Sequence, residues 1–130
     1  MTRVGITPPP GNAFFIKHTI YLSYFIWILV TITADDKRLK RGKPAPDPFL
    51  LAAACLGFLP QHCVVFEDSP SGIRAGVASG ATVIAVCTSH PREKIQDCGA
   101  HFIVNNMDDV TCEVDEDDMS GLRLKFSVKH

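Results

Sequence analysis

The feature that most constrains this chain is a short apolar run that ends in two carboxylates and a turn. Residues 63–66 read Cys-Val-Val-Phe, which is too short for a helix, is β-branched, and predicts a buried strand. Glu67 and Asp68 follow directly, and a Ser-Pro-Ser-Gly turn leads into a helix that ends before Gly80, with Ser71 as its expected N-cap. In open α/β sheets, ligands bind beyond the carboxyl ends of the strands. Two hard carboxylates there suit Mg²⁺, although a solvated turn explains an isolated acidic pair more simply.

The rest of the sequence alternates helices and strands. A helix is predicted from Pro48 to Leu56, with Asp47 as N-cap and Gly57 as its end. A buried strand at 81–87, a short helix at 91–98 with Ser89 as a possible N-cap, and a strand at 101–104 follow. This order is that of βαβ units, so we expect an α/β domain with a parallel sheet covered on both faces. Residues 122–128 alternate apolar and polar side chains, which predicts a half-exposed strand.

Composition excludes several classes of protein. At 130 residues the chain has room for one domain, and its net charge of −1 gives no support for a nucleic-acid surface. The five cysteines form no Cys-x-x-Cys pair and are odd in number. We therefore expect free thiols in a reducing compartment, which places the protein in the cytoplasm. A cysteine nucleophile is not supported, because no partner histidine can be assigned from the sequence.

The first 33 residues differ in character from the rest. Residues 1–12 are rich in proline and glycine, whereas residues 13–33 are mostly apolar and are interrupted by Lys17 and His18. Residues 19–33 hold 15 uncharged residues, fewer than the roughly 20 that a membrane-spanning helix needs. Three interpretations stay open: a signal anchor followed by the basic cluster at 37–41, a buried element of the domain, or sequence foreign to the fold. We predict a division into an atypical segment, residues 1–33, and a core, residues 34–130.

Two blocks carry a resemblance to a known family. They are Arg-Gly-Lys-Pro-Ala-Pro-Asp-Pro-Phe at 41–49 and Val-Val-Phe-Glu-Asp-Ser-Pro-Ser-Gly-Ile-Arg-Ala-Gly at 64–76. Together they resemble the C-terminal half of haloacid dehalogenase-like phosphatases, in the group of sugar-phosphate and polyol-phosphate phosphatases and β-phosphoglucomutases. Among these the chain is most similar to fungal enzymes that act on glycerol phosphate or 2-deoxyglucose 6-phosphate. The resemblance implies a Rossmann-like three-layer sandwich, Mg²⁺ as cofactor and a small phosphorylated metabolite as partner.

The resemblance also implies roles for individual residues. Lys43 matches the lysine that screens the charge between the phosphate and the attacking aspartate, and flanking prolines suit a fixed point charge. Asp68 matches the acid that binds Mg²⁺, and Glu67 is its partner in the same metal shell. Ser69 and Gly72 belong to the turn that holds the pair. Arg74 and His90 receive no role and are expected at the surface.

The sequence departs from the family pattern in its catalytic part. The family's nucleophile is an aspartate on an N-terminal strand that ends in Asp-x-Asp, and no such strand is found. Asp115-Glu116-Asp117 has the acid spacing but lies late in the chain, and Thr31 is a poor match for the phosphate-binding threonine. The sequence also lacks a match to the cap region that closes the site and selects the substrate in this family. We therefore expect an incomplete, inactive form of a phosphatase, with a partner-binding pseudoenzyme or a protein anchored through 13–33 as alternatives.

Overall fold

The computed structural model describes residues 13–16, 32, 34–114 and 124–129. The leader at 1–12, most of the apolar segment, Thr31 and the acidic cluster at 115–118 lie outside the described residues. Within the described ranges, no helix has the length and apolar character required to cross a membrane. The predicted division after residue 33 stays a prediction, although four residues upstream of it, Ala13–Ile16, form a strand of the sheet.

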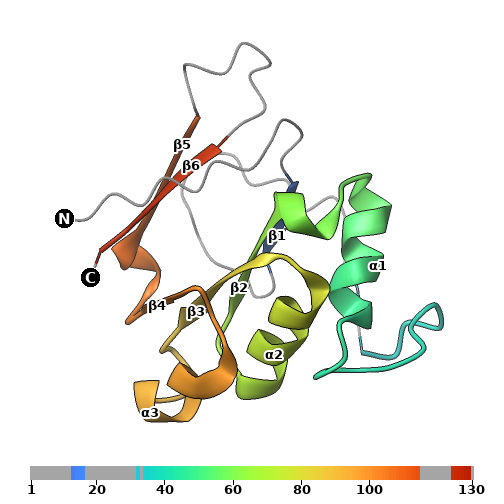
Figure 1. The fold of residues 1–130 in the computed structure, drawn as a ribbon, viewed down its shortest axis with the longest axis horizontal. Helices are drawn as coiled ribbons and strands as arrows, with labels where there is room; N and C mark the ends of the chain where they lie inside the picture. The colour runs from blue at the N-terminus through green and yellow to red at the C-terminus, as the bar shows by residue number, and fades with distance from the viewer. Residues whose placement is uncertain (1–12, 17–31, 33, 115–123, 130) are drawn as a thin grey trace.

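A four-stranded parallel sheet forms the centre of the described structure (Figure 1). Its strands lie side by side in chain order: β1 (Ala13–Ile16), β2 (Cys63–Glu67), β3 (Thr82–Val86) and β4 (Phe102–Val104). The register pairs Val64 with Thr82 and Ile84 with Phe102, so the carboxyl ends of β2, β3 and β4 meet at one edge. The predicted α/β fold with a parallel sheet is confirmed.

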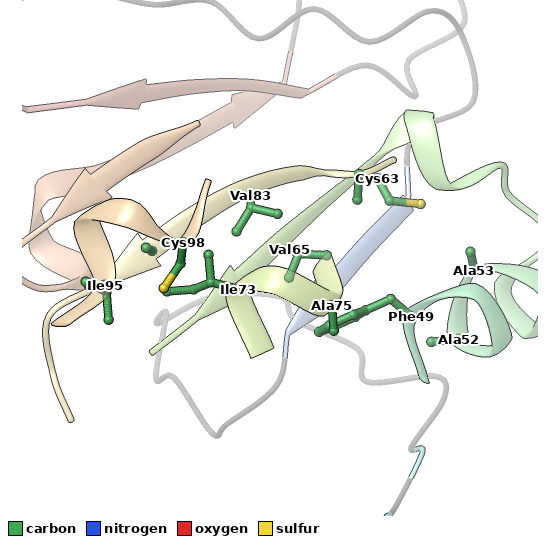
Figure 2. Close-up of a cluster of buried hydrophobic side chains, with 12 residues drawn as sticks. Phe49, Ala52, Ala53, Cys63, Val65, Ile73, Ala75, Val83, Ile95 and Cys98 are labelled. Carbon is green, nitrogen blue, oxygen red and sulfur yellow. The ribbon is translucent and has the colours of Figure 1, made fainter. Parts of the chain in front are cut away.

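The helices cover one face of this sheet. They are α1 (Asp47–Leu56), α2 (Pro70–Ser79) and α3 (Arg92–Ile95), and a 3-10 turn, Gln96–Cys98, completes the predicted 91–98 helix. Right-handed crossovers between consecutive neighbouring strands place each helix on the same side. Figure 2 shows the resulting core, in which Val65 and Val83 of the sheet meet side chains of all three helices: Phe49, Ala52, Ala53, Ile73, Ala75 and Ile95.

An antiparallel pair of strands covers the opposite face. β5 (Val110–Val114) and β6 (Leu124–Val128) are paired from Val110↔Val128 to Val114↔Leu124. Val110, Phe126 and Val128 pack against the second face of the sheet, and the Phe66 and Phe126 rings lie 6.0 Å apart between centroids. The third layer of the predicted sandwich is therefore a β-ribbon. The alternation at 122–128 is confirmed over 124–128, whereas β5 was not predicted.

Glycine residues end the helices, and a proline begins α2. Gly57, Gly80 and Gly99 have positive φ at the three predicted helix ends. The predicted N-cap of α2 is wrong: Ser69 is the cap, and its hydroxyl accepts a hydrogen bond from the Gly72 backbone N–H. Pro70 then occupies the first helical position, which a residue lacking an N–H fills without loss. Ser71, the expected cap, lies one residue inside the helix and is exposed.

Candidate functional site

The candidate site lies where β2 and β3 end. Glu67 is the last residue of β2 and pairs with Ala85, so Asp68 and the segment after β3 emerge at the same edge of the sheet. The loop that precedes α1 brings Lys43 to this edge across 24 positions of sequence. Three segments that are separate in the chain, the Lys43 loop, the acidic turn and the loop after β3, thus converge there.

Glu67 is buried and paired. Its side chain is 1% exposed, and its Oε1 accepts an ion-paired hydrogen bond from Lys43 Nζ. Ser69 Oγ lies 3.4 Å from Oε2, at the long limit of a hydrogen bond. A carboxylate removed from water requires such partners, because an unpaired buried charge is strongly destabilising. The pair therefore fixes the orientation of both side chains.

Gly72 makes room for that carboxylate. A Cβ atom at this position would lie 2.0 Å from Glu67 Oε2 and 2.3 Å from its Cδ. Real Cβ atoms essentially never approach other heavy atoms so closely. The glycine in the first turn of α2 is consequently required by the position of Glu67. The predicted turn residues Ser69 and Gly72 both contact the acid that they follow.

Lys43 also contacts an aromatic ring. It precedes Pro44 through a cis peptide bond, and its ammonium lies 5.1 Å from the centroid of the Phe49 ring, in cation–π range. Its side chain is 16% exposed, so one end of the lysine still reaches solvent. The Lys43 ammonium therefore contacts both the Glu67 carboxylate and the Phe49 ring at this edge of the sheet.

Asp68 is held by the loop after β3. Ser89 Oγ donates a hydrogen bond to Asp68 Oδ2, and His90 Nδ1 lies 2.9 Å from the Asp68 carbonyl oxygen. The interpretation of Ser89 as the N-cap of the next helix is therefore wrong, because Pro91 occupies that position. His90 is half-buried, not a plain surface residue, whereas Arg74 is exposed as expected. Neither Ser89 nor His90 was predicted to join the site.

A sequence model described as haloacid dehalogenase-like hydrolase matches residues 15–80 of the chain. This range is half of the 130 residues and contains Lys43, Glu67 and Asp68. The chain belongs to the haloacid dehalogenase-like hydrolase family. The predicted resemblance is thereby confirmed, and the match begins upstream of the two blocks on which it was based.

Two curated relatives of the chain have names that specify small phosphate esters as their substrates. Hexitol phosphatase A of Escherichia coli (strain K12) is 56% identical over 57 residues, which are 44% of this chain and 26% of that protein. Glycerol-1-phosphate phosphohydrolase 1 of Saccharomyces cerevisiae is 36% identical over 86 residues, 61% of this chain and 34% of that protein. The chain thus spans about a third or less of the length of these relatives.

Two solved structures share part of this fold. A haloacid dehalogenase hydrolase, family IA, variant 3, from Entamoeba histolytica matches with a TM-score of 0.54 at 36% identity, over 59% of this chain and 34% of that chain. A hydrolase from Pseudomonas syringae matches with a TM-score of 0.53 at 28% identity, over 58% of this chain and 35% of that chain. The parallel sheet with its helices is therefore part of the haloacid dehalogenase-like fold.

Of the two acids of this haloacid dehalogenase-like site, Asp68 suits a magnesium ion better than Glu67. The described residues contain no group of three or more His, Cys, Asp or Glu side chains that could hold a metal. Glu67 is committed to Lys43, whereas Oδ1 of Asp68 takes part in none of the hydrogen bonds or ion pairs between described residues. Mg²⁺ typically takes one or two carboxylates and fills its other positions with water and phosphate oxygens. Asp68 fits that pattern, and Glu67 as a direct ligand stays a prediction.

In the described part of the chain, the strand beside the acids carries no carboxylate. Among the described residues, β1 is the strand next to β2, and the sequence continues from it as Lys17 and His18, without a carboxylate. Burial raises the pKa of the Cys63 thiol to about 12, so it stays protonated at neutral pH and is a poor nucleophile. Among the described residues, the site therefore combines an ammonium with two carboxylates, and neither carboxylate lies on the strand next to β2.

Proposed function

We propose that this chain binds the phosphate group of a small sugar or polyol phosphate, with Mg²⁺, at the carboxyl edge of its sheet, and that it does not hydrolyse the ester as written. The observation that carries the proposal is the Lys43–Glu67 ion pair beside Asp68. The proposal is supported by the ammonium of Lys43 and the carboxylate of Asp68, which lie together at the edge where α/β folds bind their ligands.

Each residue has a separate part in the proposed binding. Lys43 donates to a phosphate oxygen while Glu67 holds its ammonium in place, which is electrostatic preorganisation. Asp68 supplies a carboxylate oxygen to the metal. When bound, Mg²⁺ would neutralise negative charge on the phosphate oxygens. The substrate class follows from hexitol phosphatase A and glycerol-1-phosphate phosphohydrolase 1, whose names specify small polyol phosphates.

The proposed lack of turnover follows from the chemistry of the site. Covalent phosphoryl transfer through a carboxylate needs that group in line with the phosphorus atom. The sequence that follows β1 offers a lysine and a histidine at 17 and 18 and no acid. The partner-binding and membrane-anchored alternatives are not favoured by the family match. A cytoplasmic location and a phosphorylated metabolite as partner stay predictions.

The test separates binding from hydrolysis. Inorganic phosphate or glycerol 1-phosphate with Mg²⁺ should raise the thermal midpoint of the 130-residue chain, and Lys43→Ala should abolish that shift. Lys40→Ala, at an exposed lysine three positions earlier, is the matched control and should retain it. A panel of polyol and sugar phosphates should release no inorganic phosphate. A missing shift would overturn the binding proposal, and phosphate release that Asp68→Asn abolishes would overturn the proposed inactivity.

A further inference from the structure

The loop after β3 contacts Asp68 at two separate points. Ser89 Oγ donates to the carboxylate oxygen Oδ2, and His90 Nδ1 lies 2.9 Å from the backbone carbonyl oxygen of the same residue. Both contacts span more than 20 positions of sequence. Ser89 and His90 lie outside residues 15–80, the range that the family match covers. Ser89 and His90, adjacent residues in the loop after β3, therefore both hydrogen-bond to Asp68 at the end of the neighbouring strand β2.

The chemistry of each contact fixes a different part of Asp68. A carbonyl oxygen only accepts hydrogen bonds, so His90 must carry its proton on Nδ1 and donate it. That bond holds the backbone at the point where the chain leaves β2. The serine hydroxyl donates to Oδ2 and so holds the rotation of the carboxylate. Oδ1 is then the oxygen of this carboxylate that is left for another ligand among the described contacts.

We propose that Ser89 and His90 are positioning residues that orient Asp68 toward a divalent cation. The inference rests on the proposed function, because it requires Asp68 to be a metal ligand. Hydrogen-bond partners of metal-ligating carboxylates hold the ligand in its binding geometry, and their removal weakens metal binding without removing a ligand. Ser89 acts on the side chain and His90 on the main chain of the same residue.

If Ser89 and His90 had a purely structural role, removing their contacts would change stability rather than the affinity for the cation. The Ser89–Asp68 bond lies in an exposed setting, where water replaces a lost partner and the net effect on the free energy of unfolding is small. Loss of the Ser89 contact should therefore leave the thermal midpoint nearly unchanged, whereas loss of the part-buried His90 contact should lower it somewhat more. The effect should appear in the affinity for the cation, since that affinity depends on where Oδ1 lies. Metal affinity, read together with stability, distinguishes positioning from packing.

The experiment measures Mn²⁺ binding to the full 130-residue chain by electron paramagnetic resonance of the free aquo ion, with Mg²⁺ as competitor. Asp68→Asn defines the specific site. Ser89→Ala and His90→Ala should each weaken Mn²⁺ binding roughly 10- to 100-fold, the range typical of partners that orient metal ligands. Ser89→Thr keeps a hydroxyl, and His90→Asn places an amide N–H near the position of Nδ1, so both should retain most of the affinity. Thr88→Ala, at an exposed neighbour in the same loop, is the control and should bind as the unmodified chain does.

The outcomes separate this inference from the proposed function. If Asp68→Asn abolishes binding but Ser89→Ala and His90→Ala bind Mn²⁺ normally, the positioning role is overturned and the metal site stands. If the unmodified chain shows no binding that depends on Asp68, the metal part of the proposed function fails, and the inference fails with it. Should Ser89→Ala not fold, Ser89→Cys replaces it, because a thiol is a weak donor. Equal affinity of that variant and the unmodified chain would also overturn the inference.

Discussion

Replacing Gly72 by alanine tests whether the buried acid determines the start of α2. The added Cβ would lie 2.0 Å from Glu67 Oε2, and real contacts of this kind are at least 3.0 Å, so the atoms must separate by at least about 1 Å. The backbone of Gly72 is fixed by the helix and by the cap bond to Ser69. Glu67 must therefore move, and its carboxylate loses its present alignment with Lys43.

The magnitude follows from two opposing effects. Leaving one member of a buried ion pair without its partner destabilises a protein by about 3–5 kcal/mol. Alanine in place of glycine inside a helix stabilises by roughly 0.5–1 kcal/mol. The free energy of unfolding of Gly72→Ala should accordingly fall by about 2–4 kcal/mol. Gly42→Ala is the matched control: a Cβ there meets nothing within 4 Å, so the change should be neutral or slightly stabilising.

A double-mutant cycle in urea, followed by circular dichroism, identifies the cause. In a Glu67→Ala background the new methyl group no longer meets a carboxylate, so Gly72→Ala should lose its effect or stabilise slightly. A neutral Gly72→Ala in the unmodified chain would refute the reasoning. An equal loss of stability in both backgrounds would refute it too, since the cause would then lie in the helix itself.

Three further predictions concern other contacts of the fold. Lys43→Met should lower the free energy of unfolding by about 3–5 kcal/mol in urea, because it leaves Glu67 buried and unpaired; a loss below about 1 kcal/mol would show that water reaches this acid. Ser69→Ala should destabilise by about 1 kcal/mol and Ser71→Ala by less than half of that, as measured in the same way, and the reverse order would restore Ser71 as the cap. Cys63 should resist a disulfide reagent at about pH 8 in the native chain, because burial raises its pKa to about 12. It should react once urea unfolds the protein. Rapid labelling of Cys63 in the native chain, mapped by mass spectrometry, would contradict this prediction.

The local patterns of this sequence predict most of its secondary structure. The apolar runs at 63–66 and 81–87 form β2 and β3, and the glycines at 57, 80 and 99 end the predicted helices. These features depend on residues close together in the chain. The N-cap error at α2 had a local signal as well: a serine directly before a proline fits a cap followed by the first helical position. The alternation of Val110, Cys112 and Val114 was a comparable signal for β5.

The contacts that build the candidate site are less predictable. Lys43 and Glu67 were singled out, but their ion pair joins residues 24 positions apart, and nothing in either segment alone specifies the other. Ser89 fits a helix cap by its neighbours, yet it bonds to Asp68 because the parallel register brings the ends of β2 and β3 together. His90 reaches the same acid for the same reason. Partners set by strand register follow only from the assembled sheet.

The order of the strands has a consequence for how the chain folds. β2 pairs with β3 and β3 pairs with β4 across short connections, so these contacts close short loops at low entropic cost. β1 is separated from its partner β2 by a much longer stretch of chain that includes α1, and its pairing closes the largest loop of the sheet. Low contact order favours rapid assembly. We therefore expect β2 to β4 to form an early cooperative unit onto which β1 docks late, an order that pulsed hydrogen exchange of the backbone amides would show.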